Sequence, residues 1–273
     1  MNKNTVLIAG IVLVIVVGLF AFIKVGQNRC PLRGIAGDPA AARALLEDAR
    51  RLESQQSFLE SKAAYQKLVN DYPNARSVME WQKKIEDLTM KLLFSPAIIP
   101  GSVEYTVQAG DSLEKIARDH KTTVELIKRS NGLDSEIIFP GKKLKVWTQG
   151  FSIAVDKSQN VLILKSKEEI IKTYNVATGK NNSTPVGTFK IIEKIVNPPW
   201  YKPGGGIAPA GTPENILGTR WMGWDKEGFG IHGTTDPKSI GSQATAGCVR
   251  MANPDVEELY GIVPQGTEVT IVD

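Results

Sequence analysis

Apolar residues are arranged in four ways along this chain, and each arrangement predicts a different kind of element. Residues 6–23 form an uncharged apolar run, close to the ~20 residues that cross a bilayer as a helix. From 38 to 94, apolar residues recur every three or four positions, which predicts amphipathic helices. Two short helical patterns lie between strand patterns in 104–148, and partial alternation in 151–273 predicts a mainly β region.

These patterns predict a multidomain chain whose parts are joined by short linkers. Ser95-Pro96 and Pro100-Gly101 interrupt the periodicity, as Pro and Gly do between elements. We expect a transmembrane helix and juxtamembrane linker in residues 1–37, a short helical spacer in 38–95, a linker in 96–103, a βααβ module in 104–148 and a mainly-β domain in 151–273.

The apolar run at 6–23 is interpreted as an uncleaved, single-pass anchor. A signal peptide is the alternative, but its apolar core is usually about 7–15 residues and a small-residue cleavage site should follow closely. Lys24, Arg29 and Arg33 follow the run, whereas Lys3 precedes it, so the positive-inside rule alone would place the body in the cytoplasm. No lipidation motif precedes Cys30, which we expect to be a free thiol.

The helical region contains a segment with a weak family resemblance. The stretch from Ala63 to Pro73 is similar to a single tetratricopeptide unit, a motif that normally needs at least three copies to form a solenoid. A spacer role, or a docking site for a protein partner, fits these helices, and plain packing helices are the alternative.

The last region should form a β-sandwich or a barrel-like fold. Its β-branched, partly alternating segments predict strands at 151–156, 160–165, 170–177, 188–196 and 268–272. One helix is expected from Pro254 to Tyr260, with Asn253 as its cap and Pro at the first position. The run Gly204-Gly205-Gly206 lacks the strand-to-helix context of a phosphate loop and is expected to be a flexible loop near a substrate cleft.

Composition and charge narrow the possible functions. The chain has 273 residues, 42% hydrophobic and 23% charged, enough for a sizeable core plus small modules. The net charge is +4, but residues 151–273 hold 12 Lys and Arg against 13 Asp and Glu, so the basic excess lies in the first 150 residues. Without a basic run or a stacking motif, we expect no nucleic-acid partner.

A histidine and a cysteine in glycine-flanked segments are the candidate catalytic pair. The chain has two of each, and His232 precedes Cys248 by sixteen positions. A thiol with a pKa of about 8.5 needs a nearby imidazole to become a nucleophile at neutral pH. Gly247 can adopt a positive φ and help form an oxyanion hole from backbone N–H groups. In an extended segment, Arg250 would point to the same side as Cys248 and could hold a carboxylate.

These residues also carry a family resemblance. The segments Ile231-His232-Gly233-Thr234 and Thr245-Ala246-Gly247-Cys248-Val249-Arg250, together with Gly211 to Asn215 and Leu217 to Trp221, are similar to the catalytic domain of the YkuD-type L,D-transpeptidases. Ala246 departs from the pattern, since many members carry a second histidine there. The chain order His then Cys argues against NlpC/P60 peptidases, and the absence of a Thr-Leu-x-Thr-Cys motif argues against sortases.

The resemblance implies a cell-wall enzyme with a cysteine nucleophile. Cys248 would attack the bond between a diamino acid and D-alanine in a peptidoglycan stem peptide, and His232 would manage the proton. The Gly233 carbonyl would orient His232, the amides near Gly247 would stabilise the oxyanion, and Arg250 and Thr245 would contact substrate. An L,D-carboxypeptidase and a non-catalytic peptidoglycan-binding scaffold are the alternatives. No cofactor or metal is expected, because a zinc site would consume the nucleophile.

Residues 104–147 are similar to a LysM domain. Two capping spacings, Asp111 to Glu114 and Thr122 to Glu125, predict the starts of its helices, and His120 is expected on the exposed surface of the first. The resemblance implies binding of N-acetylglucosamine-containing glycan. The candidate glycan-binding residues lie in the loops after the first strand and before the last: Gly110, Asp111, Ser112, Ile138, Phe139 and Pro140.

Both resemblances concern the bacterial cell wall. We therefore expect the body of the chain on the periplasmic or cell-wall side of the membrane, although the positive-inside rule alone would place it in the cytoplasm.

Overall fold

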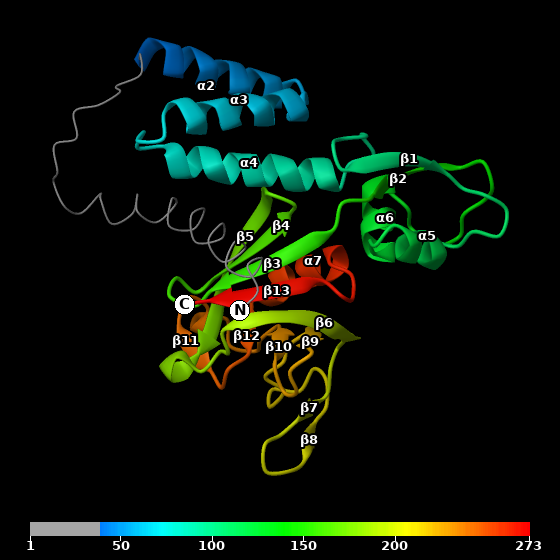
Figure 1. Cartoon of the computed structure of the whole chain (residues 1–273), viewed down its shortest axis with the longest axis vertical. Coiled ribbons are helices and arrows are strands. Elements are labelled where there is room, and N and C mark those ends of the chain that lie inside the picture. Colours follow the sequence, from blue (N-terminus) through cyan, green and yellow to red (C-terminus); the bar gives the residue numbers. More distant parts are fainter. Residues whose placement is uncertain (1–38) are drawn as a thin grey trace, which may run out of the picture. The chain divides into compact units, whose positions relative to one another are not determined.

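The computed structural model describes residues 39–273 (Figure 1). The chain divides into two compact units after Leu88, a position inside helix α4 (Val78–Leu93). The predicted anchor at 6–23 and Cys30 lie outside the described residues. Within residues 39–273, no helix has both the length and the apolar character needed to span a bilayer.

The first unit is built from helices around a small apolar core. Helices α2 (Pro39–Ser54) and α3 (Phe58–Asp71) pack with the first turns of α4, and Tyr65, Leu68 and Trp81 are buried among them. The chain leaves α3 at Tyr72, just before Pro73, which cannot donate the next helical hydrogen bond. These helices are those predicted from the periodicity, while the tetratricopeptide resemblance stays a prediction.

The βααβ order predicted for the next region is confirmed. Strands β1 (Ser102–Thr106) and β2 (Lys143–Trp147) pair in antiparallel fashion, and helices α5 (Leu113–Asp119) and α6 (Val124–Asn131) lie between them in sequence. A separate apolar cluster, with Leu113, Ile127 and Leu144 fully buried, stabilises this module.

Three local predictions in this module were wrong. The helix caps are Ser112, which accepts from the Lys115 amide at 3.2 Å, and Thr123, which accepts from the Leu126 amide at 2.9 Å. Both caps lie one residue after the predicted Asp111 and Thr122, because either of two adjacent polar residues can start a helix and only the backbone path decides between them. His120 lies just beyond α5, half-buried, with its ring edge-on to Tyr105 at 5.4 Å.

The remaining region is a sheet that closes on itself. Its strand order is β11-β5-β12-β10-β9-β6-β13-β3-β4, and β5 also pairs with β4. The strands are β3 (Phe151–Asp156), β4 (Val161–Ser166), β5 (Glu169–Gly179), β6 (Gly187–Val196), β9 (Arg220–Trp224), β10 (Gly230–His232), β11 (Gln243–Thr245), β12 (Val249–Met251) and β13 (Glu268–Val272). The five predicted strands are present and the barrel-like alternative is the correct one. The short strands β9 to β12 were missed.

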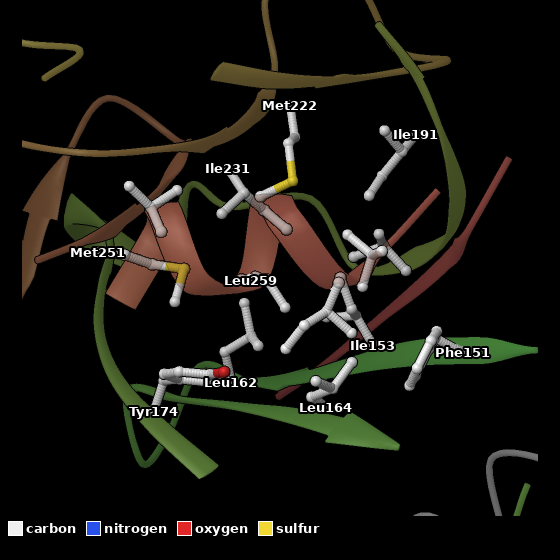
Figure 2. Packing of buried hydrophobic residues seen from close by; sticks show 14 of the residues in the cluster. Phe151, Ile153, Leu162, Leu164, Tyr174, Ile191, Met222, Ile231, Met251 and Leu259 are labelled. Atoms are coloured by element: carbon white, nitrogen blue, oxygen red, sulfur yellow. The ribbon is translucent and has the colours of Figure 1, made fainter. Parts of the chain in front are cut away.

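Helix α7 (Asn253–Ile262) supplies the centre of the core of this domain. In Figure 2, Leu259 of α7 lies between side chains of β3 to β5, such as Leu164, and side chains of the neighbouring strands, such as Met222 and Ile231. All of these are fully buried. Burying one such side chain contributes about 1.5–3 kcal/mol to the stability of the fold. The core therefore holds β9, β10 and β12 in place, and the residues on the other face of these strands are held with them.

Candidate active site

Strand pairing brings the candidate histidine and arginine side by side. In the parallel pair β10 and β12, Ile231 is opposite Val249 and His232 is opposite Arg250. Ile231 and Val249 are fully buried in the core, so His232 and Arg250 project from the other face of the sheet. Cys248, two residues before Arg250, projects from that same face.

These side chains line one cleft of about 580 Å³. His232, Cys248, Arg250 and Thr245 all contribute to its wall. The rest of the wall is largely apolar, with the prolines and aromatic rings of 198–201 and the aliphatic residues of 216–217. Binding clefts commonly combine such an apolar wall with a few convergent polar groups. The glycine run 204–206 forms the turn between the short strands β7 (Trp200–Tyr201) and β8 (Ile207–Ala208) beside this wall.

His232 is buried and its ring orientation is fixed by the backbone. Only 2% of its surface is exposed, and Nδ1 lies 2.6 Å from the carbonyl oxygen of Gly233. Because a carbonyl only accepts, Nδ1 must carry the proton, which leaves the Nε2 lone pair available as a base. Burial lowers the pKa of His232 to about 4, so the imidazole is neutral at pH 7.

Cys248 is held as a thiol rather than as a thiolate. It is half-buried, with Sγ 3.5 Å from the carbonyl oxygen of Gly228 and the Gly230 amide hydrogen-bonded to the sulfur. Burial raises the pKa of this thiol above its ordinary value, and the Gly230 amide and Arg250 only partly oppose that effect. The candidate nucleophile and the candidate base are therefore both neutral at pH 7, so an attack by Cys248 would require its proton to move to an acceptor.

The turn before Cys248 depends on Gly247 and Thr245. Gly247 has φ +139°, and a Cβ there would lie 2.6 Å from the Phe229 ring. The Gly247 amide donates to the Thr245 hydroxyl at 3.1 Å, and that hydroxyl donates to the Cys248 carbonyl at 2.7 Å. The Thr245 hydroxyl thus stabilises the turn. Of the two amides predicted to form an oxyanion hole, the Gly247 amide is used in the turn, and neither of these two bonds uses the Cys248 amide.

The Arg250 guanidinium has a side-chain partner at a terminal nitrogen and a buried, unpaired donor at Nε. A terminal guanidinium nitrogen donates to the Ser239 hydroxyl at 3.0 Å. Its Nε is buried and has no hydrogen-bond partner among the described residues. Leaving a buried donor unpaired costs about 1–3 kcal/mol, a cost that a bound carboxylate would remove.

Asn253 does not cap α7, contrary to the prediction from the sequence. Instead of capping α7, its side-chain oxygen accepts from the Thr234 amide at 2.9 Å and from the Thr219 amide at 3.4 Å. Helix α7 begins at Asn253 itself, and Ala252 occupies the cap position. The side chain thereby joins the start of α7 to the segment that follows His232, a long-range role that no local pattern reveals.

Replacing Asn253 by alanine should therefore destabilise the fold around His232. Two backbone donors lose their acceptor, and we expect the free energy of unfolding to fall by about 1–3 kcal/mol. Urea denaturation of the full-length protein measures this. Asn253→Asp is the matched control, since it keeps the acceptor and places a negative charge at a helix N-terminus. Equal losses in both variants would contradict this role.

The structure also locates the predicted glycan-binding residues. The Gly141 amide donates to the Val107 carbonyl at 2.8 Å, which brings the loop of 138–140 beside the segment leading to Gly110. Phe139 and Pro140 are exposed, whereas Ile138 packs against the core of the module. The adjacent Ile137, 69% exposed, was not predicted and adds apolar surface to the loop.

Asp111 and Ser112 have local structural contacts. The Asp111 carboxylate accepts from the Tyr105 hydroxyl at 2.7 Å and the Gln108 amide at 2.8 Å, and it pairs with Lys115 at 2.9 Å. Hydrogen bonds from Lys115, Gln108 and Tyr105 lower the pKa of Asp111 to about 2. Ser112 caps α5, so both side chains shape the loop that is predicted to contact a glycan.

In residues 39–273, no group of three or more His, Cys, Asp or Glu side chains is placed to hold a metal ion.

Comparison with known proteins identifies relatives of two parts of the chain. The L,D-transpeptidase catalytic domain family (YkuD) matches residues 150–271, and the LysM domain family matches residues 105–147. The putative L,D-transpeptidase YkuD of Bacillus licheniformis is 38% identical over 176 residues, which cover 61% of this chain and 97% of that protein. The protein of the same name in Bacillus subtilis is 37% identical over 175 residues, with the same coverage. The N-acetylmuramoyl-L-alanine amidase sle1 of Staphylococcus epidermidis is 40% identical over 76 residues, 23% of this chain and 24% of that protein.

Proposed function

The chain belongs to the YkuD family of L,D-transpeptidase enzymes, and on that premise we propose that it cross-links peptidoglycan stem peptides through a cysteine thioester. The observation that carries this proposal is the cleft in which Cys248, neutral His232 and Arg250 project from one face of adjacent strands. The donor is a stem peptide ending in a diamino acid and D-alanine, and the acceptor is the side-chain amine of a second stem peptide.

The first half of the reaction forms the thioester. The Cys248 sulfur attacks the carbonyl carbon of the diamino acid while its proton passes to Nε2 of His232. The Cys248 amide donates to the oxyanion of the tetrahedral intermediate. As the intermediate collapses, the C–N bond breaks, the imidazolium returns its proton to the leaving amine, and D-alanine departs.

The second half reverses these roles with a different amine. The acceptor amine attacks the thioester carbonyl, His232 takes its excess proton, and the C–S bond breaks. The cysteine sulfur leaves and recovers its proton from the imidazolium. If water attacks instead, the product is a tripeptide and the enzyme is an L,D-carboxypeptidase.

Arg250 is proposed to hold a carboxylate of the stem peptide through its unpaired Nε and the adjacent terminal nitrogen. Arg250→Lys keeps the positive charge but loses the two-pronged geometry, so we expect the KM for the donor peptide to rise about 10- to 100-fold. Steady-state kinetics with a tetrapeptide donor tests this. Lys238→Arg, the reverse exchange between the same two residue types at the exposed position next to Ser239, should leave KM unchanged. An unaltered KM in Arg250→Lys would remove Arg250 from substrate binding.

The LysM module is proposed to bind the glycan strands of the same polymer, with the exposed loop at Phe139 as a contact. We also propose that residues 6–23 anchor the chain in a bacterial membrane with its body on the periplasmic or cell-wall side, and that a protein partner docks on helices α2 to α4. The family and the LysM match support a location next to the cell wall.

Product analysis tests the proposed reaction. The full-length protein is incubated with a disaccharide-tetrapeptide, and the products are identified by mass spectrometry. A cross-linked dimer with the loss of one D-alanine is the expected result. A tripeptide without a dimer would assign an L,D-carboxypeptidase, and sacculus binding without any product would favour a peptidoglycan-binding scaffold.

A further inference from the structure

An indole ring on the strand next to His232 covers one side of the imidazole. Trp221 of β9 is opposite His232 of β10 in the antiparallel pair, and the two rings stack with centroids 6.1 Å apart and an interplanar angle of 26°. Both residues line the cleft that contains Cys248. The ring of Trp221 therefore excludes water from the imidazole on that side.

Two glycines make room for the indole. Gly223 is opposite Gly230 in the sheet, and a Cβ on Gly230 would lie 2.9 Å from two atoms of the Trp221 ring. A Cβ on Gly223 would lie 2.8 Å from the indole nitrogen. The ring consequently lies across a strip of sheet without side chains, where any larger residue would displace it.

A carboxylate fixes the far end of the same ring. Trp221 Nε1 donates to a carboxylate oxygen of Glu193 at 3.1 Å, and Glu193 is opposite Gly223 across β6 and β9. The acceptor carries a full negative charge, which makes this hydrogen bond stronger than one between neutral groups. Glu193 thus opposes rotation of the indole away from His232.

We infer that Trp221, held by Glu193, is a positioning residue that keeps the His232 imidazole dry and aligned for proton exchange with Cys248. This inference rests on His232 acting as the base in the proposed function. The charged and titratable groups that line the cleft with His232 are Arg250 of β12, Cys248 just before β12, and Glu193 of β6, which is bonded to the indole. Burial is the largest cause of the low pKa of His232, followed by the positive charge of Arg250. Loss of the indole should weaken the first cause and leave the second in place.

The two histidines of the chain make a direct test possible. In full-length protein carrying His120→Gln, His232 is the one remaining histidine. Its titration can be followed by NMR of the imidazole Cε1–H group. We expect Trp221→Ala to raise the pKa of His232 from about 4 by at least one unit. Trp221→Phe, which keeps a ring over the imidazole, should shift it by less. Trp200→Ala, which removes an indole from another part of the cleft wall, is the control and should not shift it.

Two substitutions at Glu193 test the same inference without removing the indole. Glu193→Gln keeps an acceptor for the indole and should retain the wild-type titration, whereas Glu193→Ala should raise the pKa of His232 in the same direction as Trp221→Ala. In transfer assays, the acid limb of kcat/KM should move to higher pH in parallel with the NMR titration. A merely structural role would lower activity equally at every pH.

The outcomes separate this inference from the proposed reaction. If folded Trp221→Ala and Glu193→Ala both leave the His232 titration unchanged, the inference is wrong. If Trp221→Ala does not fold, as judged by its thermal transition, Trp221→Phe and Glu193→Ala decide the question. If the titration shifts as expected but wild-type protein makes neither dimer nor tripeptide, the positioning role stands and the proposed function fails.

Discussion

Replacing Cys248 by alanine is expected to abolish both dimer and tripeptide formation, with a loss of at least about 10³-fold in kcat/KM. Among the described residues that line the cleft, Cys248 is the only one with a sulfur atom, and no thioester can form without that atom. Binding of the donor peptide should persist because Arg250 and the apolar wall are unchanged. Mass spectrometry of the protein after exposure to donor peptide should show an acyl adduct in the wild type and none in Cys248→Ala.

The second cysteine supplies the matched control. Cys30→Ala removes a thiol from outside the catalytic domain and should leave turnover and the adduct unchanged.

The raised pKa of the Cys248 thiol predicts how its alkylation depends on pH. Alkylation of Cys248 by iodoacetamide should be slow at pH 7 and should increase until the pH exceeds the ordinary thiol value. A plateau below pH 7 would mean that the resting enzyme already contains a thiolate, and the neutral-pair mechanism would then be incorrect.

The second large effect is expected for His232→Ala, which should lower kcat/KM about 10²- to 10⁴-fold at neutral pH. Cys248 would then lose the imidazole proposed as its base, and its own raised pKa leaves little thiolate at pH 7. Activity should partly recover as the pH rises and the thiol ionises without help. His120→Ala, a histidine outside the catalytic domain, is the control. A His232→Ala enzyme with wild-type activity at pH 7 would exclude His232 as the base.

The burial of His232 also predicts how stability depends on pH. The unfolded chain takes up this proton near the ordinary pKa of 6.5, whereas the folded protein takes it up only near 4. Between these values the unfolded state binds more protons. The free energy of unfolding should therefore fall as the pH is lowered from 6.5 to 4, by at most about 1.4 kcal/mol per pH unit from this group, with no contribution above 6.5. His232→Gln should remove this part of the slope.

The sequence predicted those elements whose own length contains a repeating pattern. The helices of the first unit, the βααβ module and strands such as β3 and β13 each span enough residues to show a period. Strands β10 and β12 have three residues each, too few for alternation to be recognised. Their structure is dictated by pairing with each other and with neighbours that are distant in the chain. The elements that carry the site were therefore the ones the pattern could not reveal.

The candidate site was predictable as a set of residue types but not as a set of contacts. The rarity of His and Cys, and the motif around them, indicated His232, Cys248 and Arg250. The indole of Trp221 and the side chain of Asn253 went unrecognised because their roles depend on strand register and on a bond across 19 residues. The helix caps failed for a different reason, since adjacent Asp and Ser, or adjacent Thr residues, satisfy the same local rule.

The pairing of β13 with β3 and β6 has a consequence for how the catalytic domain is made. The first strand of the domain lies parallel to its last, with Ser152 opposite Glu268 and Asp156 opposite Val272. A ribosome delivers β3 more than a hundred residues before its partner exists, and such distant contacts form slowly because the loop must close first. Until β13 is made, the barrel lacks the strand that joins β3 to β6, so we expect the cleft around Cys248 to be incompletely formed. The cleft that contains Cys248 is therefore expected to be complete only after β13 has emerged, and a chain shortened before β13 should carry the Cys248 thiol without the surrounding cleft.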